Sequence, residues 1–297
     1  MPVSLHFLDG AGDFLAAAGD LLAAAPVEST IVAGVAHRML RDQAAWIAPD
    51  RDVPTWWLVV RDDAGSVVGA GMSTAPFAPY PPYLLAMPDE AARRLAQTLH
   101  ERGEAPSGVN GALPAVEVVA AETARLSGRT YRVAEHLRLH ELGELVEPVP
   151  PPGRARLARD DEVDLVVSWH AAFGRDAAEQ AGRDEPHPGA EEDRDSMLRR
   201  IAEGSVWVWE DAAGRAVHFT GASRPAYGVS RIGPVYTPRE HRGRGYAGAT
   251  VAAASRALLD QGARVCLFTD QANPVSNALY ERLGFRPVVD MANVLIE

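Results

Sequence analysis

The sequence of 297 residues lacks lysine, has one cysteine and contains no apolar run of the roughly 18 residues that a membrane-spanning helix needs. A single cysteine excludes an intrachain disulfide. Because no secretory signal is visible at the first residues, we expect a cytoplasmic protein. The sequence has 29 basic and 40 acidic residues, which gives a formal net charge of −11. This excess of negative charge disfavours a nucleic-acid surface, so we expect no nucleic-acid partner. Without an apolar run of membrane length we also expect no membrane partner.

The chain is long enough for two domains, each with its own core. Its middle contains the sequence E-P-V-P-P-P-G at residues 147–153, which is typical of a stiff, extended linker. We therefore predict a first domain at residues 1–147, a Pro-rich linker at 148–152 and a second domain at 153–297.

The two halves resemble each other on either side of this linker. Residues 59–68 and 208–217 both read as strand, Asp/Gly turn and strand, at an offset of 149 residues (214 − 65). We expect two helices before each hairpin, near residues 10–24 and 27–47 in the first half and near 159–173 and 191–203 in the second. An acidic loop at 174–192 should join the last two helices.

A glycine-rich loop, R-G-R-G-Y-A-G at residues 242–248, lies between a predicted strand at 231–237 and a predicted helix at 248–259. The N–H groups at the start of a helix have no intrahelical acceptor, and the helix dipole is positive at that end. Phosphate is the usual anion at such a site. The loop therefore predicts a phosphate-bearing ligand.

Residues 243–248 also match the dinucleotide pattern G-x-G-x-x-G, and Asp270 stands where a ribose-binding acid would. Residues 238–242, however, separate the loop from its strand, and two arginines lie within the loop. Only 27 residues follow Asp270 (297 − 270), too few for the second half of a doubly wound sheet. A nicotinamide or flavin site is therefore disfavoured. The Gly-Lys-Ser/Thr of a Walker A loop is absent from the sequence.

The loop resembles the R/Q-x-x-G-x-G/A motif of the GNAT superfamily of acyl-CoA-dependent N-acyltransferases. Residues 273–285 resemble the second signature of that family, N-x-x-[SA]-x-x-x-Y-x-x-x-G-F. The resemblance covers about residues 153–297 and implies an α/β fold (an α+β mixed sheet), mainly antiparallel and flanked by helices. With the repeat it implies two tandem GNAT-like domains. The first is degenerate, because Pro88-Asp89-Glu90 stands where its glycine loop should be.

This resemblance implies transfer of an acyl group, most often acetyl from acetyl-CoA, to a primary amine by direct attack. The N–H of Tyr236 would stabilise the oxyanion, and Tyr280 would act as general acid. No metal is implied. The expected cofactor-binding residues are Val235, Tyr236, Thr237, Arg242, Gly243, Arg244, Gly245, Tyr246, Ala247, Gly248, Asn273 and Ser276.

The general base stays unassigned. The family position eleven residues before Arg242 holds Arg231 (242 − 11 = 231), which is no base. Glu210, His218 and His170 are the weak candidates. The acceptor is expected to be a small-molecule or peptide amine and the protein a monomer or homodimer. The alternative function is a non-catalytic acyl-CoA-binding or structural GNAT-like protein.

Overall fold

The computed structural model describes residues 2–41, 54–183 and 192–297. The chain forms two compact units: unit 1 comprises Met1–Arg138 and Val289–Glu297, and unit 2 comprises Leu139–Val288. Two long strands, β6 (Tyr131–Leu142) and β12 (Phe285–Ile296), have residues in both units. Within the described ranges, no helix is long and apolar enough to cross a membrane.

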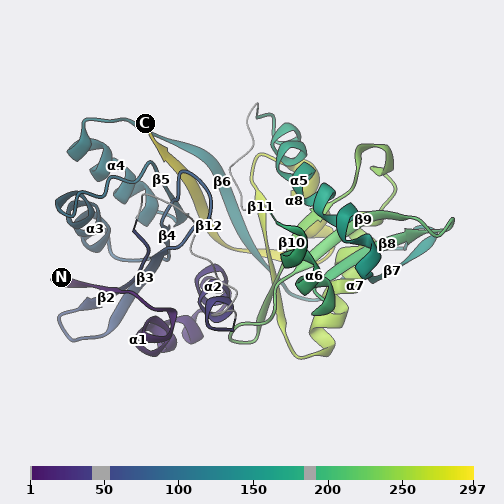
Figure 1. The fold of residues 1–297 in the computed structure, drawn as a ribbon, viewed down its shortest axis with the longest axis horizontal. Helices are drawn as coiled ribbons and strands as arrows, with labels where there is room; N and C mark the ends of the chain where they lie inside the picture. The colour runs from purple at the N-terminus through teal and green to yellow at the C-terminus, as the bar shows by residue number, and fades with distance from the viewer. Residues whose placement is uncertain (1, 42–53, 184–191) are drawn as a thin grey trace. The chain divides into compact units, whose positions relative to one another are not determined.

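Unit 1 contains a mixed sheet in the order β1-β2-β3-β4-β5-β12-β6, in which β4 and β5 are parallel and the other recorded pairs are antiparallel (Figure 1). Successive side chains of a strand point to opposite faces of the sheet, so one strand can pack against helices on both faces. Trp57 packs on Phe14 of one helix layer, whereas Trp56 joins the core on the opposite face. The elements are β1 (Val3–Leu8), α1 (Ala11–Ala24), α2 (Thr30–Arg41), β2 (Trp56–Asp62), β3 (Val67–Ser73), β4 (Tyr83–Leu84), α3 (Asp89–Glu101), β5 (Gly108–Ala112) and α4 (Ala115–Ser127).

Unit 2 repeats this plan with the order β6-β11-β10-β9-β8-β7, in which only β10 and β11 are a recorded parallel pair. Helices α5 and α6 pack on one face of the sheet, and α7 and α8 contribute to the cores on the other. The elements are β7 (Gly153–Leu157), α5 (Val163–Gln180), α6 (Arg194–Ala202), β8 (Val206–Asp211), β9 (Ala216–Ala222), β10 (Val229–Tyr236), α7 (Tyr246–Asp260), β11 (Arg264–Asp270) and α8 (Pro274–Arg282), with short 3-10 turns at Asp160–Glu162 and Arg239–His241.

The predicted duplication is visible in the two hairpin turns. Asp62 accepts backbone hydrogen bonds from residues 64 and 66, and Asp211 accepts them from residues 213 and 215. Gly65 and Gly214 follow with φ of 81° and 79°, a left-handed conformation that glycine adopts without strain. The predicted fold class, α/β with mixed and mainly antiparallel strands flanked by helices, is confirmed, and the strands of the two copies are recorded in one 12-stranded order.

Several predicted boundaries differ from the structure. Helix α5 continues to Gln180, so the expected loop at 174–192 is helical over its first residues. Alanines at 177 and 178 favour a helix and offset the cost of the interior glycine at 174. Part of the helix predicted at 27–47, and part of the acidic loop, lie outside the described residues. Strands β1 and β7, which begin the two copies, were not predicted.

The predicted linker at residues 148–152 lies within unit 2, while residues 289–297 lie in unit 1. The division into domains at 1–147 and 153–297 stays a prediction.

Candidate functional site

The glycine loop has the conformation that its sequence demands. Gly243 and Gly245 have φ of 74° and 83°. No atom lies within 4 Å of a Cβ built on Gly243, and only Pro151, at 3.9 Å, approaches one on Gly245. The backbone conformation rather than crowding therefore requires glycine here, and the space beside the loop is open.

The N–H groups of residues 243–248 point to an anion site at the start of α7. Among the residues that the structure describes, no backbone carbonyl or side chain accepts a hydrogen bond from them. The helix begins at Tyr246 with Gly245 as its N-cap and without a side-chain cap, so its positive end is also free. A row of unpaired donors on open backbone fits a pyrophosphate.

Strands β10 and β11 separate beside this loop. Their parallel pairing runs from Val229 opposite Arg264 to Ile232 opposite Leu267 and stops there. On its other edge, β10 has a register shift between Ile232 and Val235. The end of β10, which includes Val235 and Tyr236, thus has a backbone edge without a β11 partner. An extended ligand arm could pair with such an edge as an added strand.

Arg242 was predicted to contribute charge to the loop, and the structure gives its side chain other partners. Its Nη2 donates to Asp176 Oδ2 over 2.6 Å, and its Nε donates to the carbonyl oxygen of Thr237 over 3.0 Å. The guanidinium therefore ties the loop to helix α5 and to the end of β10. Arg244, by contrast, is exposed and bonds only to the carbonyl oxygen of Glu240 among the recorded contacts.

Asp176 is a residue that the sequence did not reveal, because it fell in the predicted loop. It accepts hydrogen bonds from Arg242, from the Tyr236 hydroxyl over 3.0 Å and from Arg239 over 3.4 Å. Burial works to raise the pKa of Asp176. The hydrogen bond from Tyr236 and the charges of Arg242 and Arg239 outweigh it and lower that pKa. One ionised carboxylate thus holds both the loop and the end of β10.

Asp176→Asn should weaken CoA binding about three- to tenfold in isothermal titration calorimetry, because the variant loses one charge-assisted bond that orders the loop. Glu179→Gln is the matched control. Glu179 lies on α5 like Asp176, its side chain is 61% exposed, and it pairs with Arg239, so the CoA affinity of this variant should match the wild type. Equal affinities for both variants and the wild type would remove the role given to Asp176.

Tyr280 lies on α8, in the same core as Leu267 and with Val235 packed against that core. Its side chain is only 7% exposed, and its ring packs edge-on against Phe285 with centroids 5.9 Å apart. Burial raises the pKa of the Tyr280 phenol above its usual range, so the hydroxyl stays protonated at neutral pH. In the described part of the chain no group is recorded as hydrogen-bonded to it. A protonated, uncommitted hydroxyl can donate a proton.

Three other predicted cofactor residues have structural partners. The Asn273 side chain caps α8, accepting from the N–H groups of Val275 and Ser276 over 3.2 and 3.1 Å. Ser276 Oγ donates to the carbonyl oxygen of Asn273. Tyr246 packs its ring near Trp209, with centroids 6.1 Å apart. These side chains support the loop and α8, and any contact of Tyr246 with a ligand falls to its backbone.

Two of the candidate bases lie beside charged side chains. Glu210 bonds Arg156 over 2.7 Å and Arg154 over 2.9 Å, and the Arg156 hydrogen bond leads in lowering the pKa of Glu210. A carboxylate with a lowered pKa is a weaker proton acceptor. His170 lies 3.9 Å from Glu192 and is mostly buried, and burial lowers its pKa despite that carboxylate. The neutral His170 keeps the ability to accept a proton.

His218, the third candidate, is completely buried. Its two ring nitrogens lie 2.7 Å from Thr237 Oγ1 and 2.8 Å from Thr220 Oγ1. Burial lowers its pKa to about 3. At neutral pH the ring therefore connects β9 to the end of β10 as a neutral hydrogen-bonding group, an arrangement that favours a structural role.

This burial predicts a pH-dependent stability. The folded state binds a proton at His218 only near pH 3, whereas the unfolded chain binds it near 6.5, so stability is full above 6.5 and is lost progressively as the pH falls. The wild type should lose about 2 kcal/mol more than His218→Gln between pH 7 and pH 5. Urea unfolding at both pH values measures this difference, and parallel losses in the two proteins would contradict it.

Asp270 also has partners that bear on the dinucleotide alternative. Its carboxylate pairs with Arg183 and accepts from the N–H of Ala272 over 2.9 Å. The sheet of unit 2 ends at β7, and its order is not that of a doubly wound fold. Asp270 therefore links the segment that follows α5 to the end of β11.

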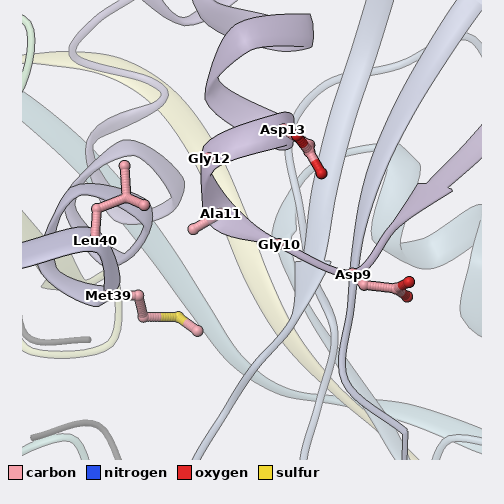
Figure 2. A pocket seen from close by; sticks show the side chains of 7 residues that line it. All are labelled: Asp9, Gly10, Ala11, Gly12, Asp13, Met39 and Leu40. Carbon is pink, nitrogen blue, oxygen red and sulfur yellow. The ribbon is translucent and has the colours of Figure 1, made fainter. Parts of the chain in front are cut away.

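At the corresponding position the described part of unit 1 has no glycine loop. Its α3 starts after Pro88 and has Asp89 and Glu90 in its first turn, where they would repel a phosphate. Figure 2 shows the residues that line a hollow of unit 1 at the start of α1, among them Asp9, Asp13, Met39 and Leu40. None of the residues lining this hollow is basic. Neither place suits a phosphate, which favours the prediction that this copy is degenerate.

Comparison with known proteins identifies the architecture. Residues 220–293 match the family model described as FR47-like protein. The chain is similar to a GCN5-related N-acetyltransferase from Sphaerobacter thermophilus, at TM-score 0.58 and 16% identity, covering 98% of this chain and 94% of that one. No curated protein matches the chain.

Two further structures match over nearly the whole chain. A tandem GNAT protein from the clavulanic acid biosynthesis pathway has TM-score 0.56 and 17% identity, with 100% of this chain and 98% of that one covered. A Drosophila protein has TM-score 0.64 and 14% identity, with 98% of each chain covered. The chain therefore has the fold of the GNAT superfamily in its tandem arrangement, with an FR47-like segment at residues 220–293.

Proposed function

We propose that unit 2 binds acetyl-CoA and transfers the acetyl group to a primary amine by direct attack. The observation that carries this proposal is the row of unpaired N–H groups at residues 243–248 beside the separated ends of β10 and β11. A pyrophosphate needs the first feature and a pantetheine arm the second. Acetyl-CoA, when bound, supplies an activated thioester as acyl donor.

The residues of this chain have the following parts in the proposal. The backbone N–H groups of residues 243–248 bind the pyrophosphate, and the free edge of residues 235–237 binds the arm. The N–H of Tyr236 donates to the carbonyl oxygen as negative charge develops on it. The Tyr280 hydroxyl gives its proton to the departing sulfur, a role that its raised pKa supports.

The acceptor in this proposal is a small-molecule or peptide amine, and the protein acts in the cytoplasm as a monomer or homodimer. A panel of amines mixed with acetyl-CoA and the purified chain tests it through the release of free thiol. Turnover with one class of amine supports the enzyme.

A second candidate is a non-catalytic acyl-CoA-binding protein. Two observations favour it: Arg231 stands at the family position of a base, and Glu210 and His218 have structural partners. Tight CoA binding without thiol release across the panel would support this candidate, and absence of CoA binding would contradict both.

A further inference from the structure

Thr269 carries a buried hydroxyl without a hydrogen-bond partner. It lies near the end of β11, and its residue is 3% exposed. Among the described residues nothing donates to or accepts from its Oγ1. An unpaired buried hydroxyl costs free energy, so its presence calls for a partner that the described residues do not supply.

The position of Thr269 relates this hydroxyl to the candidate site. The pairing of β10 with β11 ends at Leu267, so Thr269 lies in the separated part of β11. Side chains two residues apart on a strand share a face, which places Thr269 on the face of Leu267. Leu267 belongs to the same core as Tyr280. Thr269, beside the strand separation, and Tyr280 thus lie on the same face of the sheet, and neither hydroxyl has a partner among the described residues.

Other buried hydroxyls in unit 2 have partners. Thr220 bonds His218, Thr250 bonds the carbonyl oxygen of Tyr246, and Ser230 bonds the carbonyl oxygen of Ser223. Ser255 differs from these three: it is completely buried in the second half of α7 and, within the described residues, lacks a partner. It therefore provides a control for the cost of an unpaired hydroxyl away from the separated strands.

We propose that the Thr269 hydroxyl is a ligand-binding group that hydrogen-bonds an amide of the pantetheine arm of CoA. This inference rests on the proposed function of unit 2. It adds a contact from β11 to the contacts from β10, so the arm is held from both strands. The hydroxyl remains unpaired in the apo chain and gains its partner on binding.

Thr269→Val tests the proposal, because valine keeps the branched shape and removes only the hydroxyl. The apo variant should unfold about 2–4 °C above the wild type, since an unpaired buried hydroxyl is removed. Its affinity for CoA, measured by calorimetry, should fall about three- to tenfold. Thr269→Ser, which keeps the hydroxyl, should bind CoA within about twofold of the wild type.

Two controls separate a contact with the arm from a general effect. Ser255→Ala should raise the unfolding temperature without changing CoA affinity. ADP has a pyrophosphate but no pantetheine arm, so Thr269→Val should bind ADP as the wild type does. Equal losses of affinity for CoA and ADP would overturn the inference. Unchanged CoA affinity would overturn it too, and is expected if the hydroxyl bonds only an ordered water. Either result would leave the proposed function standing. Failure of the wild type to bind CoA would overturn both.

Discussion

Gly245→Asp should reduce the affinity for CoA by more than about 100-fold, because it places a carboxylate in the predicted pyrophosphate site. Two unit charges about 4 Å apart interact with about 4 kcal/mol at an effective dielectric constant of 20. The substitution should leave the fold intact, since no atom comes closer than 3.9 Å to the new Cβ. Aspartate also tolerates a φ of 83° better than most residues and is favourable at a helix N-cap. Calorimetry with CoA and a thermal unfolding curve measure the two effects.

Gly245→Asn is the matched control, because asparagine has nearly the size of aspartate and the same tolerance of a left-handed backbone, but no charge. It should lose no more than about tenfold in affinity, the part of the effect that comes from filling the loop. Similar losses in the two variants would assign the effect to size rather than charge. Unchanged affinity in both would place the pyrophosphate elsewhere.

Tyr280→Phe should slow acetyl transfer about 100-fold while CoA affinity stays within about twofold of the wild type. The variant removes a hydroxyl whose pKa burial has raised and which therefore remains a proton donor through neutral pH. Stability should change little, because no recorded hydrogen bond in the described residues involves this hydroxyl. Single-turnover release of thiol, with an amine that the wild type acetylates, measures the rate.

A parallel variant, Tyr131→Phe, removes an exposed tyrosine hydroxyl from unit 1 and should turn over at the wild-type rate. If Tyr280→Phe reacted as fast as this control, Tyr280 would not be the general acid. If it were slow but also failed to bind CoA, the hydroxyl would belong to binding rather than to proton transfer.

The parts of the site that depend on local sequence were predictable. Glycines at 243 and 245 require a left-handed backbone, and Asn273 followed by proline starts a helix, so each motif contains the reason for its own structure. The two Asp/Gly hairpins likewise give similar turns because the same side chain accepts the same backbone bonds. The local sequence was therefore enough to predict the loop, helix α8 and the repeat.

The contacts that connect distant elements were not predictable. Asp176 lies 66 positions from Arg242 and has no neighbouring motif, and its helix was read as ending before it. Nothing in the sequence distinguishes Thr269, because only the end of the pairing with β10 makes its hydroxyl notable. The partners of His218 show the same limit: its burial depends on β9, β10 and α7 packing together.

The return of β12 to unit 1 has a consequence for synthesis on the ribosome. Its residues Val289–Ile296 lie between β5 and β6 in the strand order, although β5 and the start of β6 precede all of unit 2 in the chain. A ribosome adds about 5–20 residues per second, so β5 and β6 wait many seconds before the strand between them is made. During this interval the edges of β5 and β6 face no strand, the state in which a growing chain most needs protection from aggregation.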